Sequence, residues 1–288
     1  MRTKNNIFKT LVYIFAFFSI ALLLILIGFM FKESLPFFKQ YSVNKFLLGN
    51  LWDSMDGSFG AFNIILASFY IALLACVFSF PISYGLSLMI VFYTNNKVKT
   101  LVSWIIRILA GIPSIIYGFF GLFVIVKFFE KNFKMAAGES VFAGSVILSI
   151  MILPYFVEVL TETFEKIKQK YKRQSDCFGI SKEYFIRKIV LKQSLRSAFS
   201  GFVLAFSRAI GETMAVMMVI GNAPIFPKFF SKAETIASLI ALEVGMSEAG
   251  SLHYHALYAS SFVLLVFVII LDIILFVTKK RTDNYDEV

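Results

Sequence analysis

Two charged side chains stand inside a long apolar stretch of the sequence. Arg208 and Glu212 lie within the block Phe199–Gly221, and the hydroxyl of Thr213 follows them. A charged side chain at the centre of a bilayer costs at least about 2.5–3.5 kcal/mol on insertion scales, so its presence requires a reason. At about 1.5 Å per residue, Arg208 would lie about 14 Å into this segment, close to mid-bilayer. Glu212 would follow one helical turn later on the same face.

This pair permits two interpretations. In the first, Arg208 and Glu212 form a structural ion pair that fixes helix packing. In the second, the guanidinium of Arg208 binds an anion in transit through its fork of donors, and Glu212 holds that guanidinium or competes with it. Thr213 completes the candidate substrate pathway. The spacing leaves both interpretations open, and both require the pair to face other helices or water rather than lipid.

Other groups that could do chemistry are sparse. No Gly-x4-Gly-Lys-Ser/Thr phosphate loop occurs, so this chain does not bind ATP through one. No nucleophile–histidine–acid constellation is present, which makes a membrane enzyme a poor fit. His253 and His255 have no third ligand at metal-binding spacing, and Cys76 and Cys177 indicate neither a disulfide framework nor a metal site. We therefore expect no catalytic residue, no metal site and no cofactor in this chain.

The elements that position the charged pair are predicted to be membrane spans. Of the 288 residues, 58% are hydrophobic and only 16% are charged, and a soluble domain of this length could not cover its exterior with that composition. A helix needs about 20 apolar residues to cross a hydrocarbon core of about 30 Å. The sequence therefore predicts an all-α polytopic membrane protein with six transmembrane helices. The six qualifying segments are Phe8–Phe31, Phe62–Tyr93, Leu101–Phe128, Val141–Thr163, Phe199–Gly221 and Ala256–Thr278.

The basic residues predict an orientation. Most of the 28 Lys and Arg residues lie in the termini and in alternate loops, above all in the loop Phe164–Ala198. Basic loops stay in the cytoplasm, so both termini are expected to be cytoplasmic. This distribution explains the net charge of +10 better than a nucleic-acid partner does, because no basic patch is interleaved with exposed aromatic residues. The first apolar segment has no small-x-small cleavage site and is predicted to be a retained anchor.

Two further features suggest a helix that docks on another surface and a hinge within a membrane segment. The loop Phe164–Ala198 predicts a helix, a break at Gly179 and an amphipathic helix over Ser181–Leu195. Such a helix either lies on the membrane surface or docks into a groove of another protein, and the pattern does not decide between them. Gly111 and Pro113 break the third segment near its middle, as a kink or as the hinge of a gate.

The cytoplasmic loop resembles that of a known family. Inner-membrane permeases of the type I ABC importers have a loop with the pattern Glu-Ala-Ala-x3-Gly-x9-Ile-x-Leu-Pro. Gly179, Ile189 and Leu191 match this pattern at the right spacing. Two positions depart from it: Lys192 replaces the proline, and the opening triplet reads Arg173-Gln174-Ser175.

Three more stretches resemble phosphate permeases within that family. Residues 110–122 are similar to their third-helix motif. Residues 208–222 are similar to the PstC-type subunits, whose PstA-type partners usually continue Gly-Glu-Thr with Ala-Pro instead of the Met-Ala-Val found here. Residues 247–253 also look PstC-like. The resemblance covers roughly residues 59–279.

The resemblance implies a heteromeric importer of inorganic phosphate in a bacterial inner membrane. A second, PstA-like permease subunit would complete the pore, a PstB-like ATPase dimer would bind ATP and Mg²⁺, and an extracytoplasmic PstS-like protein would deliver phosphate. The chain itself would be non-catalytic. Arg208, Glu212 and Thr213 would lie on the phosphate route. The coupling helix that docks on the ATPase would comprise the loop positions Arg173, Gln174, Ser175, Gly179, Ile189 and Leu191.

The implied fold is a MetI-like core of five helices, with the first helix peripheral. Residues 59–279 would form the permease domain, residues 1–58 the N-terminal tail, first helix and first external loop, and residues 280–288 a cytoplasmic tail. Two other functions stay open. One is an ABC permease for another oxyanion, such as molybdate or sulfate, and the other is a transporter that works without ATP, which the divergent Arg173-Gln174-Ser175 triplet would suit.

Overall fold

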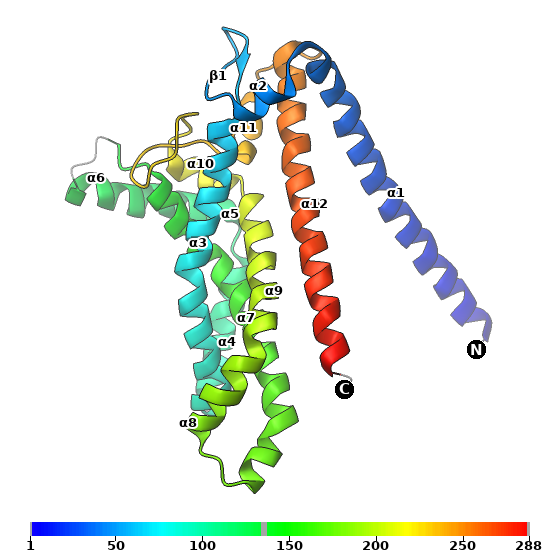
Figure 1. Cartoon of the computed structure of the whole chain (residues 1–288), viewed down its shortest axis with the longest axis vertical. Helices are drawn as coiled ribbons and strands as arrows, with labels where there is room; N and C mark the ends of the chain where they lie inside the picture. The colour runs from blue at the N-terminus through cyan, green and yellow to red at the C-terminus, as the bar shows by residue number, and fades with distance from the viewer. Residues whose placement is uncertain (1, 134–136, 287–288) are drawn as a thin grey trace.

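The structure is a computed structural model that describes residues 2–133 and 137–286, and it is an elongated bundle of helices (Figure 1). Its elements run in a single chain order from the outermost helix α1 to the long C-terminal helix α12. They are α1 (Arg2–Gln40), α2 (Val43–Leu48), β1 (Trp52–Asp53), β2 (Ser58–Phe59), α3 (Phe62–Leu88), the π-helical turn η1 (Met89–Tyr93), α4 (Asn96–Gly111), α5 (Ser114–Phe120), η2 (Gly121–Val126), α6 (Lys127–Phe133), α7 (Val141–Cys177), α8 (Lys182–Tyr184), η3 (Phe185–Val190), α9 (Leu191–Ile210), α10 (Met214–Ile220), α11 (Ile236–Glu243) and α12 (Leu252–Asp286).

Within the described residues, five helices are long and apolar enough to cross a membrane. The number reaches six when the bent pair Asn96–Gly111 and Ser114–Asn132 counts as one span. The predicted all-α class with six membrane segments is confirmed. Three of the helices, α1, α7 and α12, extend well beyond their predicted bounds because polar residues at their ends continue the helical backbone.

The centre of the bundle is the contact between α3 and α7. Small residues of α3 face α7, among them Ala72, Ala75 and Ser79. Lipid supplies no hydrophobic drive between helices, so packing of this kind depends on close approach and on hydrogen bonds between the helices. The hydroxyls of Ser83 and Ser87 donate such bonds to carbonyl oxygens of α7, at 3.4 Å and 3.2 Å.

The first helix is peripheral, as the sequence suggested. Helix α1 packs against α12 where the two approach each other at one end, and it then diverges from the rest of the bundle (Figure 1). Ring contacts between Phe29 and Tyr258 and between Phe31 and Phe262 hold this end. None of the most apolar stretch of α1 is buried within this chain, so lipid or another subunit must cover it.

Two predicted spans differ from the structure. The third predicted helix, Leu101–Phe128, is two helices bent by 95°, because Pro113 lacks the N–H that would continue α4 and holds Ile112 in an extended conformation. The fifth predicted helix, Phe199–Gly221, is interrupted: α9 ends at Ile210 and α10 begins at Met214. The helix before this break starts much earlier than predicted, since Lys182–Ile210 is one continuous helix of 29 residues.

Candidate functional site

Arg208 lies in the last turn of α9, where its guanidinium meets an aromatic ring. The guanidinium carbon is 4.3 Å from the centre of the Tyr155 ring on α7. Tyr155 lies about 21 Å along α7 from its first residue, Val141, at about 1.5 Å per residue. That depth is well inside a hydrocarbon core of about 30 Å. A cation–π contact therefore holds a positive charge at a depth close to mid-membrane. At that depth, the side chain of Arg208 is exposed on the outer surface of this chain.

Glu212 does not share a helical face with Arg208, which corrects the sequence prediction. It lies in the break between α9 and α10, and its Oε1 accepts a hydrogen bond from the N–H of Ala215 at 3.3 Å. This carboxylate therefore caps the start of α10, and it forms no ion pair with Arg208. The interpretation of the two residues as a structural ion pair is wrong. Thr213 is the N-cap residue of α10, and its hydroxyl donates to the carbonyl of Gly211 at 3.4 Å.

The candidate hinge at Gly111 and Pro113 coincides with the 95° bend between α4 and α5. The hydroxyl of Tyr117 donates a 2.7 Å hydrogen bond to the carbonyl of Leu109 near the end of α4, and this carbonyl also accepts a 3.3 Å bond from the N–H of Ile112. The bond from Tyr117 spans the bend and fixes its angle. A kink is thus present, and its use as a gate hinge stays a prediction.

Glycines let the bent segment pack tightly on α10. A Cβ added to Gly118 would lie 2.6 Å from the Sδ of Met218, and one added to Gly121 would lie 2.6 Å from the Cγ1 of Val219. Neither distance leaves room for a side chain, so these positions permit the close approach of the two segments. The two interruptions in the helical bundle are therefore coupled, because α5 and η2 after the bend contact α10 after the break.

Sequence reasoning missed two members of this site. Tyr155 supplies the ring beneath Arg208, and Ser207 carries a buried Oγ that has no hydrogen-bond partner in the structure. No pattern in the sequence indicates Tyr155, because its contact depends on how α7 and α9 cross. Ser207 precedes Arg208 directly and could have been considered as a polar residue in an apolar segment.

The turn between α7 and α8 follows the Schellman geometry of a helix end. The N–H of Ile180 donates to the carbonyl of Ser175 at 3.0 Å, and the N–H of Gly179 donates to the carbonyl of Asp176 at 3.1 Å. Gly179 has a φ of 65°, a conformation that glycine adopts without steric cost. Arg173 and the other triplet residues form part of the last turns of α7, not of a separate docking helix.

The predicted amphipathic helix Ser181–Leu195 also differs from the structure. Its apolar residues Phe185, Ile186 and Val190 are buried in the core of this chain. Ile189 and Leu191 are half-buried. The apolar side chains of Phe185, Ile186 and Val190 therefore pack against their own chain, and docking of the loop on an ATPase stays a prediction.

The exposed tip of the turn is made by residues that the family pattern did not indicate. The side chain of Phe178 is 82% exposed and that of Tyr184 is 54% exposed. Phe178 precedes Gly179 directly, so the Schellman turn holds it outward at the end of α7. Phe178 and Tyr184 thus expose aromatic surface on the two sides of the turn.

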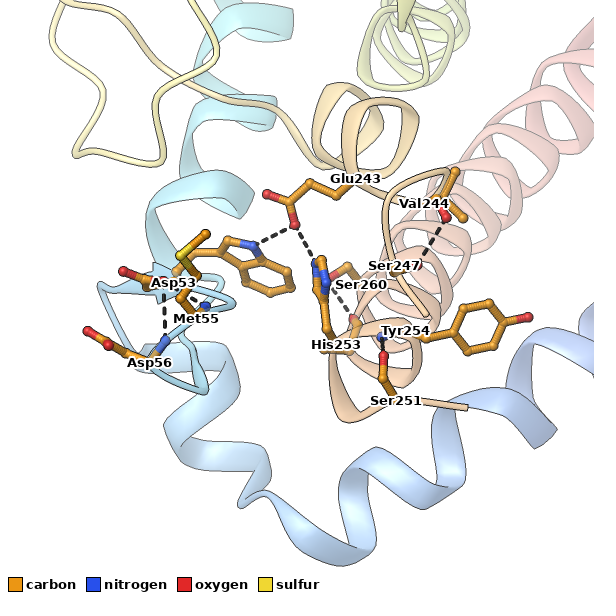
Figure 2. Close-up of polar contacts among 12 residues, drawn as sticks. Asp53, Met55, Asp56, Glu243, Val244, Ser247, Ser251, His253, Tyr254 and Ser260 are labelled. Atoms are coloured by element: carbon orange, nitrogen blue, oxygen red, sulfur yellow. Dashed lines mark hydrogen bonds and ion pairs between the residues drawn. The ribbon is translucent and has the colours of Figure 1, made fainter. Parts of the chain in front are cut away.

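At the opposite end of the bundle, polar contacts tie three separate segments together. Figure 2 shows the carboxylate of Glu243 between an indole ring and His253. Its Oε2 accepts a 3.1 Å hydrogen bond from Nε1 of Trp52 and lies 2.7 Å from Nε2 of His253. The ring of His253 stacks on Phe59, while His255 places Nδ1 2.8 Å from the carbonyl of Glu33 in α1. Both histidines thus fasten α12 to its neighbours.

A second carboxyl group lies near this network. Glu234 is only 4% exposed and precedes α11. Burial, together with the nearby charge of Glu243, raises the pKa of Glu234 from 4.5 to about 8. At neutral pH the protonated form of this buried group is therefore favoured.

The family of the chain follows from a direct comparison. Residues 79–284 match the family described as "binding-protein-dependent transport system inner membrane component". The chain belongs to this family. The permease is thus an integral membrane protein of an ABC transporter, and such permeases work together with an ATPase and further subunits.

Two relatives and one solved structure illustrate the match. The permease is 30% identical over 225 residues to the "Probable ABC transporter permease protein YqgH" of Bacillus subtilis, which covers 77% of this chain and 73% of the relative. It is 29% identical over 299 residues to the "Probable phosphate transport system permease protein PstC" of Methanocaldococcus jannaschii, which covers 96% and 94%. The structure of the MetNI methionine ABC transporter in an inward-facing conformation shares the fold, with a TM-score of 0.57 and 16% identity over 76% of this chain and 93% of that one. The predicted MetI-like fold is confirmed.

Proposed function

We propose that the permease forms half of the translocation pathway of an ATP-driven importer of inorganic phosphate. The observation that carries this proposal is the exposed side chain of Arg208, which lies at membrane depth and has no carboxylate partner among the side chains that the structure describes. An unpaired charge at this depth is costly in lipid, so a water-filled path or a second subunit must cover it. A guanidinium fork matches the oxygens of a phosphate ion, and the PstC-type relatives carry phosphate transport in their names.

The geometry supports transport by alternating access. Helix Lys182–Ile210 is continuous from the exposed turn beside Gly179 to Arg208, a length of about 43 Å at about 1.5 Å per residue. A rigid helix of this kind transmits a displacement at the turn to the far end. Arg208 binds the phosphate oxygens, Tyr155 positions the guanidinium, and Thr213 offers a hydroxyl in the neighbouring break. The bend at Gly111–Pro113 would let α5 and α10 move with this helix.

The proposed partners would cover the exposed surfaces of the chain. A PstA-like second permease would cover the face with Arg208, and a PstB-like ATPase dimer, which binds ATP and Mg²⁺, would contact the turn at Phe178. A PstS-like protein would deliver phosphate at the end that holds Trp52 and Glu243. The permease itself would be non-catalytic and would lie in the bacterial inner membrane. Both termini would be cytoplasmic, since both chain ends point toward the end of the bundle that carries α8 (Figure 1).

The test is uptake of radiolabelled phosphate by cells that express the complete transporter. Arg208→Ala should lower uptake about tenfold or more, because a hydrogen bond to a charged group contributes about 1.5–3 kcal/mol and 1.4 kcal/mol corresponds to a factor of ten. Arg208→Lys should retain an intermediate rate. Arg107→Ala, which removes an exposed charge from α4, is the matched control and should transport phosphate as the wild type does.

Two results would contradict this proposal. Wild-type uptake by an assembled Arg208→Ala complex would remove Arg208 from the pathway. Stronger inhibition of transport by molybdate or sulfate than by unlabelled phosphate would identify a different oxyanion as the substrate.

A further inference from the structure

A groove of about 450 Å³ opens between α7, α9 and the C-terminal part of α12. Its apolar end, at Val159 and Leu204, begins about one helical turn from the contact between Tyr155 and Arg208, and its other end approaches the turn at Gly179. One wall comes from α7 between Val159 and Tyr171, and the other comes from α9 between Gln193 and Leu204. The side chain of Leu275 on α12 closes the third side. Tyr155, Arg208 and Thr213 do not line it.

The lining changes from apolar to basic along the groove. At the end farther from the Gly179 turn it is formed by Val159, Leu204 and Leu275. Nearer the turn it is formed by Lys166 and Lys170. Because α7 and α9 run antiparallel, hydroxyl and amide groups of α9, including Ser197 and Gln193, lie at the same basic end. The groove is therefore amphipathic along the direction of the helices.

A glycine brings the two walls together at the apolar end. A Cβ added to Gly201 would lie 3.1 Å from Cγ1 of Val159, which is tighter than most real contacts. The floor of the groove is thus set by direct contact of the two helices. An elongated apolar group can lie along this floor, and a globular polar ion gains nothing there.

The charges at the basic end include one carboxylate. Glu162 lines the groove and forms a 2.8 Å ion pair with Lys166. The second lysine, Lys170, places its Nζ 5.6 Å from the ring centre of Tyr171. With two ammonium groups and one carboxylate, the lining has a net positive charge.

We propose that this groove binds an anionic phospholipid of the cytoplasmic leaflet, with the phosphodiester headgroup at Lys166 and Lys170 and an acyl chain along Val159, Leu204 and Leu275. Basic pockets between transmembrane helices on the cytoplasmic side are suited to anionic headgroups. Free phosphate has the same chemistry as the headgroup but no acyl chain. The apolar end of the groove therefore favours a lipid over free phosphate. The inference is independent of the substrate that the transporter carries.

The test uses native mass spectrometry of the purified full chain in detergent with added dioleoyl phosphatidylglycerol. The wild type should retain this lipid, and it should retain dioleoyl phosphatidylcholine about thirtyfold less well, since each of the two lysines near the membrane surface contributes about 1 kcal/mol. The double variant K166Q/K170Q should lower retention of phosphatidylglycerol by a similar factor. K172Q/K188Q is the matched control, because it removes two exposed lysines outside the groove and should retain the lipid as the wild type does.

A second variant tests whether the lipid occupies the groove itself. Ser197→Trp fills the groove without changing its charge and should also reduce retention, while an unchanged thermal midpoint shows that the chain is folded. Equal losses in K166Q/K170Q and K172Q/K188Q would overturn the proposal, as would equal retention of the two lipids. Displacement of phosphatidylglycerol by millimolar inorganic phosphate would assign the groove to free phosphate. Loss of the bound lipid on assembly with the second permease would assign the groove to a partner helix.

Discussion

At the residue scale, the partner of each buried or membrane-embedded charge decides what that charge can do. Arg208 rests on the ring of Tyr155, which leaves its donors open to an anion. Glu212 instead caps α10 through the N–H of Ala215. The two residues are neighbours in sequence and have separate roles in the structure. An ion pair between them would have satisfied the guanidinium and removed the reason to place it on a transport route.

Glu234 predicts how stability depends on pH. Its pKa of about 8 in the folded protein exceeds its ordinary value of 4.5, so the folded state binds the proton more tightly than the unfolded state does. The resulting stabilisation is complete below about pH 4.5 and is lost as the pH rises through about 8. We expect Glu234→Gln to remove this loss, so that the thermal midpoint in detergent falls less between about pH 5 and pH 8 than in the wild type.

The matched control for this prediction is Glu248→Gln, which removes an exposed carboxylate from the loop before α12. Its thermal midpoint should follow the wild-type curve, because any other titrating group is common to all three proteins. A curve for Glu234→Gln that parallels the wild type across this range would show that Glu234 ionises as freely in the fold as in the unfolded chain.

At the element scale, interruptions of helices matter more than the helices themselves. The bend of 95° after Gly111 and the break after Ile210 place two short segments, α5 and α10, against each other. Gly118 and Gly121 make that contact possible, because a Cβ at either position would collide with α10. Discontinuous helices of this kind recur at the substrate sites of transporters, which fits the position of Arg208 at the break.

The backbone conformation of the turn between α7 and α8 predicts that a single added methyl group at Gly179 destabilises the protein. Gly179→Ala places a side chain at a φ of 65° and should lower the free energy of unfolding by about 1 kcal/mol. Gly85→Ala is the matched control. No atom lies within 4 Å of its added Cβ, and Gly85 lies inside α3, where alanine is the better helix former. Thermal unfolding of both variants in detergent checks this prediction. Gly179→Ala should unfold at a lower temperature than the wild type, and Gly85→Ala should not. The reverse order would contradict the assigned turn.

At the scale of the whole molecule, the chain has surfaces that it cannot satisfy alone. Helix α1 diverges from the bundle with its apolar length uncovered (Figure 1). Arg208 and Phe178 are both exposed on the surface of the chain. Under the proposed function, these three surfaces would meet lipid or a second permease, an aqueous path, and the ATPase. A chain of this kind is a component of an assembly.

Phe178 predicts how strongly that assembly holds together. An exposed aromatic anchor that fills a pocket of its partner typically contributes 2 kcal/mol or more, about thirtyfold in affinity. Phe178→Ala should therefore reduce co-purification of the ATPase with the permease by about that factor and should lower phosphate uptake. Leu195→Ala removes an exposed apolar side chain from α9, away from the turn, and serves as the control. Full recovery of the ATPase with Phe178→Ala would place the contact elsewhere.

Much of this protein could be predicted from local properties of the sequence. Long apolar runs predict membrane helices because the bilayer is a uniform solvent along its plane, so each span can be recognised without its neighbours. The free-energy cost of a charge in lipid likewise singled out Arg208 and Glu212 without knowledge of the neighbouring helices. Gly179 and Pro113 were recognisable because their backbone preferences act within one or two residues.

Only the tertiary structure decided which surfaces those elements share. The ring that receives Arg208, the burial of Phe185 and Ile186 in the core of their own chain, and the groove beside Lys166 all depend on the crossing of helices that are distant in sequence. The end of α9 at Ile210 likewise had no strong local signal, since Gly211 is tolerated inside helices and the cap from Glu212 forms only once the chain has turned. Helix packing in a membrane arises from close contact between particular side chains, and composition along one helix does not record which contacts it will make.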